Sequence, residues 1–163
     1  MHHAKHQSHH FAHTISHFHI AESIHDQIYH TPLAEVIMSY SVYTAEYLGS
    51  PNHVGIFVET ASDGSGLVFH VVGNILNGMT YEKKPGKRPD DSATFVPGSK
   101  VRIGSIKATD LDRFELACKA VPAPGAQLKL NGKPKDPSKP IRRCGEWVQD
   151  VKEKVIADKI VKD

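Results

Sequence analysis

Three residues beyond the first 37 have side chains that could act together in nucleophilic chemistry: Cys144, His53 and His70. His53 and His70 are the only two of the 12 histidines that follow residue 30. A thiol next to an imidazole is the activated nucleophile of cysteine hydrolases, because the imidazole takes the thiol proton and later protonates the leaving group. These residue types therefore indicate a cysteine–histidine site.

Cys144 is expected to begin a helix that runs towards Lys162, since an apolar stripe with helical spacing follows it. The stripe consists of Trp147, Val148, Val151 and Val155. The N-terminus of a helix carries partial positive charge and stabilises a thiolate. Arg142 and Arg143, immediately before Cys144, add to that field.

The two histidines occupy similar positions on neighbouring predicted strands. His53 opens the apolar, β-rich stretch 53–59, and His70 lies within the stretch 67–72. The Gly-rich turn 62–66 joins these strands into a hairpin. Because neighbouring strands lie about 4.8 Å apart, the two imidazoles can share a small site.

The remaining pattern predicts one α+β domain over residues 38–163, in which the C-terminal helix bearing Cys144 packs against a small antiparallel β-sheet. Further strands are predicted at residues 40–47, 79–82 and 101–106. Residues 83–97 are polar and Pro-rich, which predicts a surface loop, and residues 122–143 form a long connection.

A second helix is expected before that connection. It would be capped by Thr109 or Asp110 and would end near Ala120. The residues expected to face inward are Leu111, Phe114, Leu116 and Ala117.

The first 37 residues form a separate, histidine-rich segment. It holds ten of the histidines and a single Lys or Arg, Lys5. Its origin is open: a disordered tag or extension, a disordered native tail, or a metal-binding tail. Clustered imidazoles bind Ni²⁺, Cu²⁺ or Zn²⁺ in each case, so metal binding by this segment would say little about function.

Composition places the chain among ordinary globular proteins, with 39% hydrophobic and 23% charged residues. No apolar run reaches the length of about 18 residues that a membrane span needs, and no secretory signal opens the chain. Only two cysteines are present, which favours a reducing, cytoplasmic setting over a disulfide framework. A formal net charge of +2 with scattered Lys and Arg argues against nucleic acid as a partner.

Other interpretations of the same residues remain open. A free cysteine is commonly buried and inert, and Cys118 fits that description. A metal site built from His53, His70 and Cys144 is a further interpretation, although the domain contains no CxxC or HxxxH pair. The domain could also be an inactive binding module, whose basic loop Lys129–Arg143 would suit an acidic partner.

The order of the motifs resembles that of circularly permuted papain-like proteins. The strand HVGIFV is followed by a Gly turn and a second strand bearing a histidine, and much later by RCGEWV, where a cysteine opens a helix with an aromatic residue three positions on. In this group, which includes permuted NlpC/P60-type, lecithin:retinol acyltransferase-like and PPPDE thiol enzymes, the histidine strand precedes the cysteine helix. The layout is also similar to that of a fungal branch, which implies no activity.

The resemblance implies a role for each residue: Cys144 as nucleophile, His53 as base and His70 as the third polar residue. The chain departs from the pattern at Arg143, where Asn is customary, and at Val54, where an aromatic residue is common. The implied activity is that of a cysteine-dependent hydrolase or an acyl or peptidyl transferase. It would act on an ester, thioester or amide of a small acyl or peptide substrate, without a cofactor.

Overall fold

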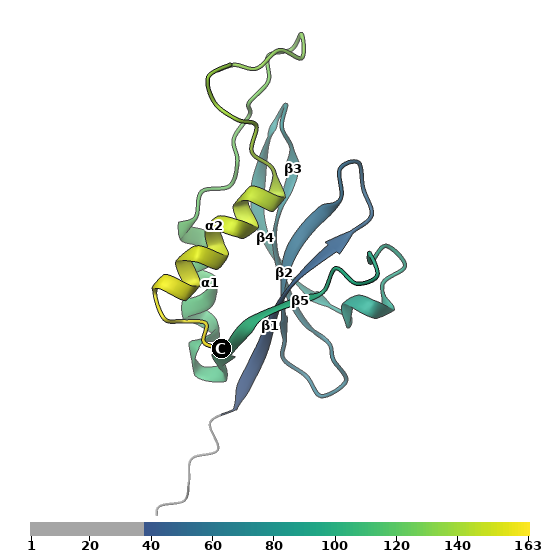
Figure 1. Ribbon diagram of the computed structural model, residues 1–163, viewed down its shortest axis with the longest axis vertical. Helices are drawn as coiled ribbons and strands as arrows, with labels where there is room; N and C mark the ends of the chain where they lie inside the picture. Colours follow the sequence, from purple (N-terminus) through teal and green to yellow (C-terminus); the bar gives the residue numbers. More distant parts are fainter. Residues whose placement is uncertain (1–37) are drawn as a thin grey trace, which may run out of the picture. The chain divides into compact units, whose positions relative to one another are not determined.

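Five strands form one antiparallel sheet in the computed structural model, which describes residues 38–163 (Figure 1). The elements are β1 Ser39–Tyr47, β2 His53–Glu59, β3 Gly66–Asn74, β4 Gly78–Gly86, β5 Val101–Lys107, the 3₁₀ turns η1 Pro89–Asp91 and η2 Ala108–Asp110, and the helices α1 Leu111–Ala120 and α2 Cys144–Ala157. The strand order is β4-β3-β2-β1-β5. The predictions for the leader, residues 1–37, lie outside the described residues.

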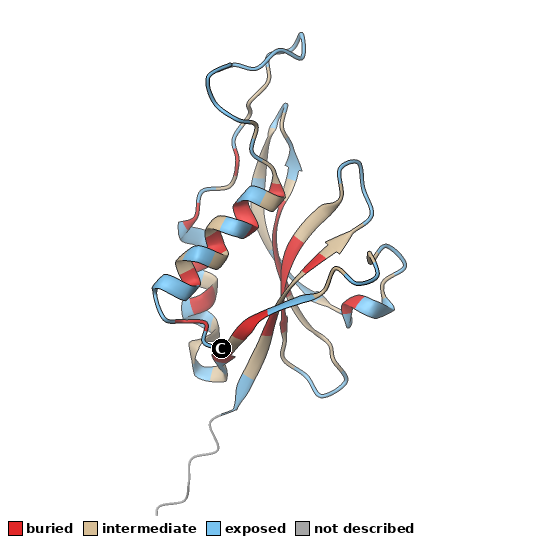
Figure 2. Cartoon of the chain, in the orientation of Figure 1, coloured by how far each residue is buried: buried red, intermediate tan, exposed pale blue. Residues whose placement is uncertain are grey.

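Both α-helices pack against one face of this sheet (Figure 1). Phe114 of α1 meets Phe69 of β3 edge to face, with ring centroids 5.1 Å apart. The ring centroids of Trp147 in α2 and Tyr81 in β4 lie 6.1 Å apart. Figure 2 shows the buried residues gathered on the helices and the central strands. The predicted α+β class, with the cysteine-bearing helix packed on a small antiparallel sheet, is confirmed.

The opposite face of the sheet is occupied in part by the segment 87–100. Tyr43 and Phe57 are register partners in β1 and β2. The ammonium group of Lys100 lies 4.3 Å from the centroid of the Tyr43 ring and 5.7 Å from that of Phe57. Since successive side chains of a strand point to opposite faces, these two rings face away from the neighbouring core residues Val42, Ile56 and Val58.

Strand β4 is longer than the predicted strand 79–82, because it continues through Pro85 to Gly86. Residues 83–86, which were expected to begin a surface loop, are therefore part of the sheet. Pro85 cannot donate a ladder hydrogen bond, but β4 is an edge strand, where proline is tolerated.

Two expectations about the helices are wrong. Helix α2 ends at Ala157 rather than near Lys162, because the chain then turns back to β5, where Lys162 and Ser105 exchange two backbone hydrogen bonds. Leu116 is 66% exposed rather than inward. Phe114, Ala117 and Cys118, at helical spacing, already form the buried face of α1.

The described helices also bear on the expectation that no segment crosses a membrane. Within residues 38–163, neither α1 nor α2 is long and apolar enough to do so.

The packing predicts that Trp147→Ala destabilises the domain strongly, whereas Leu116→Ala does not. The Trp147 side chain is fully buried, and its Nε1–H donates to the Val121 carbonyl at 3.1 Å. Its loss should lower the free energy of unfolding by about 3–5 kcal/mol, from the lost burial and the cavity left behind. Urea unfolding of both variants measures this. A comparable loss in Leu116→Ala would contradict the assigned face of α1.

Candidate active site

His53 and His70 form a direct hydrogen bond across the β2–β3 hairpin. Nε2 of His53 lies 2.7 Å from Nδ1 of His70. Gly55 lies beside this pair, and a Cβ added there would sit 3.4 Å from the Cβ of His70. Because His53 and Gly55 are two residues apart on one strand, their side-chain positions share a face. The absence of a side chain at Gly55 therefore leaves room beside the Cβ of His70.

Glu82 extends this pair into a chain of three groups. It is the register partner of His70 in β4, and its Oε1 lies 3.3 Å from Nε2 of His70. An ionised carboxylate can only accept a hydrogen bond, so Nε2 of His70 carries the proton. In neutral His70, Nδ1 then accepts from Nε2–H of His53. The remaining nitrogen of His53, Nδ1, is left unprotonated and can act as a base.

The electrostatics of the chain favour this protonation pattern. Burial lowers the pKa of His53 below its ordinary value of 6.5, and the neighbouring His70 and Lys84 lower it further. Burial also lowers the pKa of His70, with a further lowering from Lys84, although Glu82 acts in the opposite direction. The hydrogen bond from His70 lowers the pKa of Glu82. Near pH 7 both imidazoles are therefore neutral and Glu82 is ionised.

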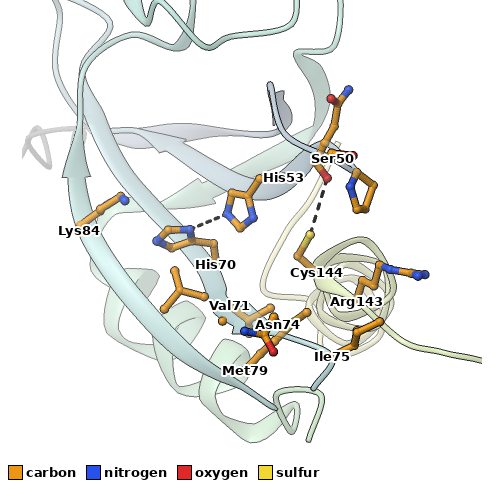
Figure 3. Close-up of a pocket in the computed structure, with 14 residues that line it drawn as sticks. Ser50, His53, His70, Val71, Asn74, Ile75, Met79, Lys84, Arg143 and Cys144 are labelled. Carbon is orange, nitrogen blue, oxygen red and sulfur yellow. Dashed lines mark hydrogen bonds between the residues drawn. The ribbon is translucent and has the colours of Figure 1, made fainter. Parts of the chain in front are cut away.

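Cys144 reaches the same place from the start of α2, with 8% of its surface exposed. Its sulfur accepts a hydrogen bond from the Val54 amide at 3.5 Å and lies 4.0 Å from the Asn52 carbonyl oxygen. In Figure 3 the His53 ring is drawn between His70 and this sulfur. Among residues 38–163, the sulfur makes no hydrogen bond to an imidazole.

The start of α2 leaves backbone donors next to the thiol. Its first intrahelical hydrogen bond runs from the Trp147 amide to the Arg143 carbonyl. The Cys144 and Gly145 amides precede it and have no partner within the helix. The Arg143 amide donates to the Glu146 carboxylate at 2.6 Å, which caps the helix and fixes its first turn.

A cavity of about 700 Å³ opens beside the thiol and both imidazoles (Figure 3). Cys144, His53, His70 and Lys84 line one part of it. The apolar side chains in its wall are Pro51, Val71, Val72, Ile75 and Met79. A cavity of this size and composition can hold a small acyl or peptidyl group next to the sulfur.

The comparison with family models covers nearly the whole of the described chain. Residues 42–162 match DUF6540, a family of unknown function. The chain belongs to this family. No curated protein and no solved structure matches it.

The structure places all three predicted site residues of this DUF6540 protein at one cavity, and their catalytic roles remain predictions. Sequence reasoning missed Glu82, Gly55 and Lys84. Glu82 lies at the end of the strand predicted over 79–82, but its pairing with His70 depends on a register that the sequence does not display. Cys118 lies apart from the site, and burial raises its pKa to about 12, which suits an inert thiol.

The metal interpretation requires nitrogen lone pairs that the hydrogen bond already uses. His53 and His70 face each other through Nε2 and Nδ1, so these two nitrogens cannot both bind a metal while that bond exists. Within the described part of the chain, no group of three or more His, Cys, Asp or Glu side chains is placed to hold a metal ion.

The two charges on β4 should move the pKa values of the imidazoles in opposite directions. Glu82→Gln removes a carboxylate that favours protonated His70, so the pKa of His70 should fall. Lys84→Gln removes an ammonium group that disfavours protonation of both rings, so the pKa values of His53 and His70 should rise. An NMR titration of the imidazole Cε1 protons, assigned with His53→Ala and His70→Ala, measures both.

Lys133→Gln is the matched control for these titrations, because Lys133 lies in the turn between Leu128 and Pro134 and does not line the cavity. It should leave both pKa values unchanged. Shifts of the same sign in Glu82→Gln and Lys84→Gln would refute the assigned electrostatics.

Proposed function

We propose that this protein is a cysteine-dependent hydrolase or an acyl or peptidyl transferase that acts on an ester, thioester or amide. The observation that carries the proposal is the hydrogen-bond chain from Glu82 through His70 to His53. This chain leaves Nδ1 of His53 as a free base at a cavity that Cys144 also lines. A base with a fixed tautomer next to a thiol is the arrangement that activates a cysteine nucleophile.

The reaction begins with proton transfer from the Cys144 thiol to Nδ1 of His53. The sulfur attacks the substrate carbonyl, and a C–S bond forms while the carbonyl oxygen gains the electron pair. The Cys144 amide at the start of α2 is placed to donate to that oxygen. When the intermediate collapses, the bond to the leaving group breaks, and the leaving group takes the proton from His53. Water or an amine then releases the acyl group from the sulfur, with His53 again acting as base.

His70 and Glu82 are positioning residues in this scheme. Neither gives a proton to the substrate. His70 holds the His53 ring by accepting its Nε2–H, and Glu82 holds His70 in the tautomer that can accept. Loss of either should therefore impair proton transfer without removing the base.

The resemblance to circularly permuted papain-like thiol enzymes supports the same assignment, because the strand with the base precedes the helix with the nucleophile. Arg143, where that group commonly has Asn, leaves the oxyanion to the backbone amides rather than to a side-chain amide. We place the reaction in the cytoplasm, where a catalytic thiol stays reduced.

A non-catalytic binding module on the same fold is the second candidate. The observation that favours it is the environment of the sulfur, which is largely buried and contacts the Val54 amide and the Asn52 carbonyl rather than an imidazole. In this candidate the cavity binds a ligand and Cys144 only packs. Thiol reactivity separates the two candidates.

Iodoacetamide should alkylate Cys144 much faster than Cys118, whose pKa burial raises to about 12. His53→Ala should slow labelling of Cys144 at neutral pH by about tenfold or more, and His70→Ala should slow it less. Because burial lowers the pKa of His53, the rate in the unmodified protein should begin to fall only below about pH 6.5. Mass spectrometry of the full-length chain over a pH series, with a chelator present, measures each rate.

Cys144→Ala is the control that assigns the labelled site. Equal labelling of the two cysteines would favour the binding module. An unchanged pH profile in His53→Ala would remove His53 as the base, and a larger effect of His70→Ala would exchange the roles of the two histidines.

A further inference from the structure

His53, His70 and Lys84 border two cavities. These three residues line both the cavity of about 700 Å³ described above and a second one of about 630 Å³. Cys144 lines only the first. The second lies on the side of segment 87–100, with Tyr47, Pro89 and Thr94 in its wall.

This arrangement implies one orientation for a bound substrate. The acyl carbon must meet the sulfur of Cys144, so the acyl part belongs to the first cavity, which the sulfur lines. The leaving group takes its proton from His53. His53 borders the second cavity and Cys144 does not, so the leaving group can occupy that cavity while its reacting atom stays next to the imidazole.

The charges of the second cavity are predominantly positive. Its lining includes Lys84 and Lys87, and its single acidic residue, Asp91, is bound to the guanidinium of Arg88 at 2.8 Å. Lys84 lies 3.5 Å from Glu82. Lys87 is exposed and takes part in no ion pair between described residues. The ammonium group of Lys87 is therefore the charge in this cavity's lining that no described carboxylate neutralises.

We propose that the substrate carries a negative charge on its leaving group and that Lys87 in the second cavity binds it, while the acyl part lies in the first cavity. The scissile bond is then internal, with substantial groups on both sides. This inference rests on the proposed function, since it needs Cys144 as nucleophile and His53 as the acid that protonates the leaving group.

Two thioesters with the same acyl group test the inference, one with 3-mercaptopropionate as leaving thiol and the other with uncharged 3-mercaptopropionamide. These leaving groups differ only in a carboxylate against a carboxamide. The full-length protein should show a kcat/KM about two- to fivefold higher for the anionic thioester, as expected for one partly exposed charge pair. The ratio should fall towards one in 0.5 M salt, where such a pair is screened. Chromatography of the released thiol measures both rates.

Variants of Lys87 assign the preference to the second cavity. Lys87→Gln should bring the ratio close to one, and Lys87→Glu should invert it, while Lys133→Gln keeps the ratio of the unmodified protein. A second pair of thioesters differs only in a carboxylate against a carboxamide at the acyl end. The ratio of their kcat/KM values should change little in Lys87→Glu.

The outcomes distinguish this inference from the function on which it rests. Rapid turnover of both thioesters with a ratio of one, or a ratio that Lys87→Glu leaves unchanged, overturns the leaving-group assignment and leaves the thiol chemistry intact. If neither thioester acylates Cys144 and iodoacetamide labels it no faster than Cys118, the proposed function fails and this inference fails with it.

Discussion

The hydrogen bond between His53 and His70 is the interaction on which the site depends. Two neutral imidazoles can form such a bond only if one donates and the other accepts. Without a third group the direction would be arbitrary, and half of the arrangements would leave a proton on the nitrogen that must act as base. Glu82 removes this ambiguity, because its carboxylate accepts from His70 and obliges His70 to accept from His53.

The hydrogen-bond chain from Glu82 to His53 can form only with the observed strand register. Glu82, His70 and His53 come from three successive strands, β4, β3 and β2, and all three side chains must lie on the face away from the helices. A slip of one residue between β3 and β4 would turn Glu82 towards the helices and replace it at this face with a neighbour. Gly55 is the other local requirement, since a Cβ there would already lie 3.4 Å from the Cβ of His70 and a larger side chain would crowd that residue.

The sequence predicts the parts of this arrangement that depend on local pattern. The apolar run from His53 and the Gly-rich turn predict the hairpin, and the stripe after Cys144 predicts helix α2. The partnership of Glu82 with His70 was not predictable, because it depends on the β3–β4 register, which is set in part by Gly73 and Gly78 at positive φ. The predicted strand 79–82 ended too early for a related reason. An edge strand tolerates a proline such as Pro85, but nothing in the local sequence pattern shows that this strand lies at the edge of the sheet.

Glu82 and Lys84 lie two residues apart on β4 and shift the pKa of His70 in opposite directions, and Lys84 also lowers the pKa of His53. In the resting site, burial and Lys84 keep both rings neutral. When His53 receives the thiol proton, the imidazolium that forms is stabilised by the negative sulfur and, through the polarised His70 ring, by Glu82. Lys84 opposes this second contribution. Lys84 therefore limits how long the proton stays on His53, which favours transfer of that proton to the leaving group over a stable ion pair.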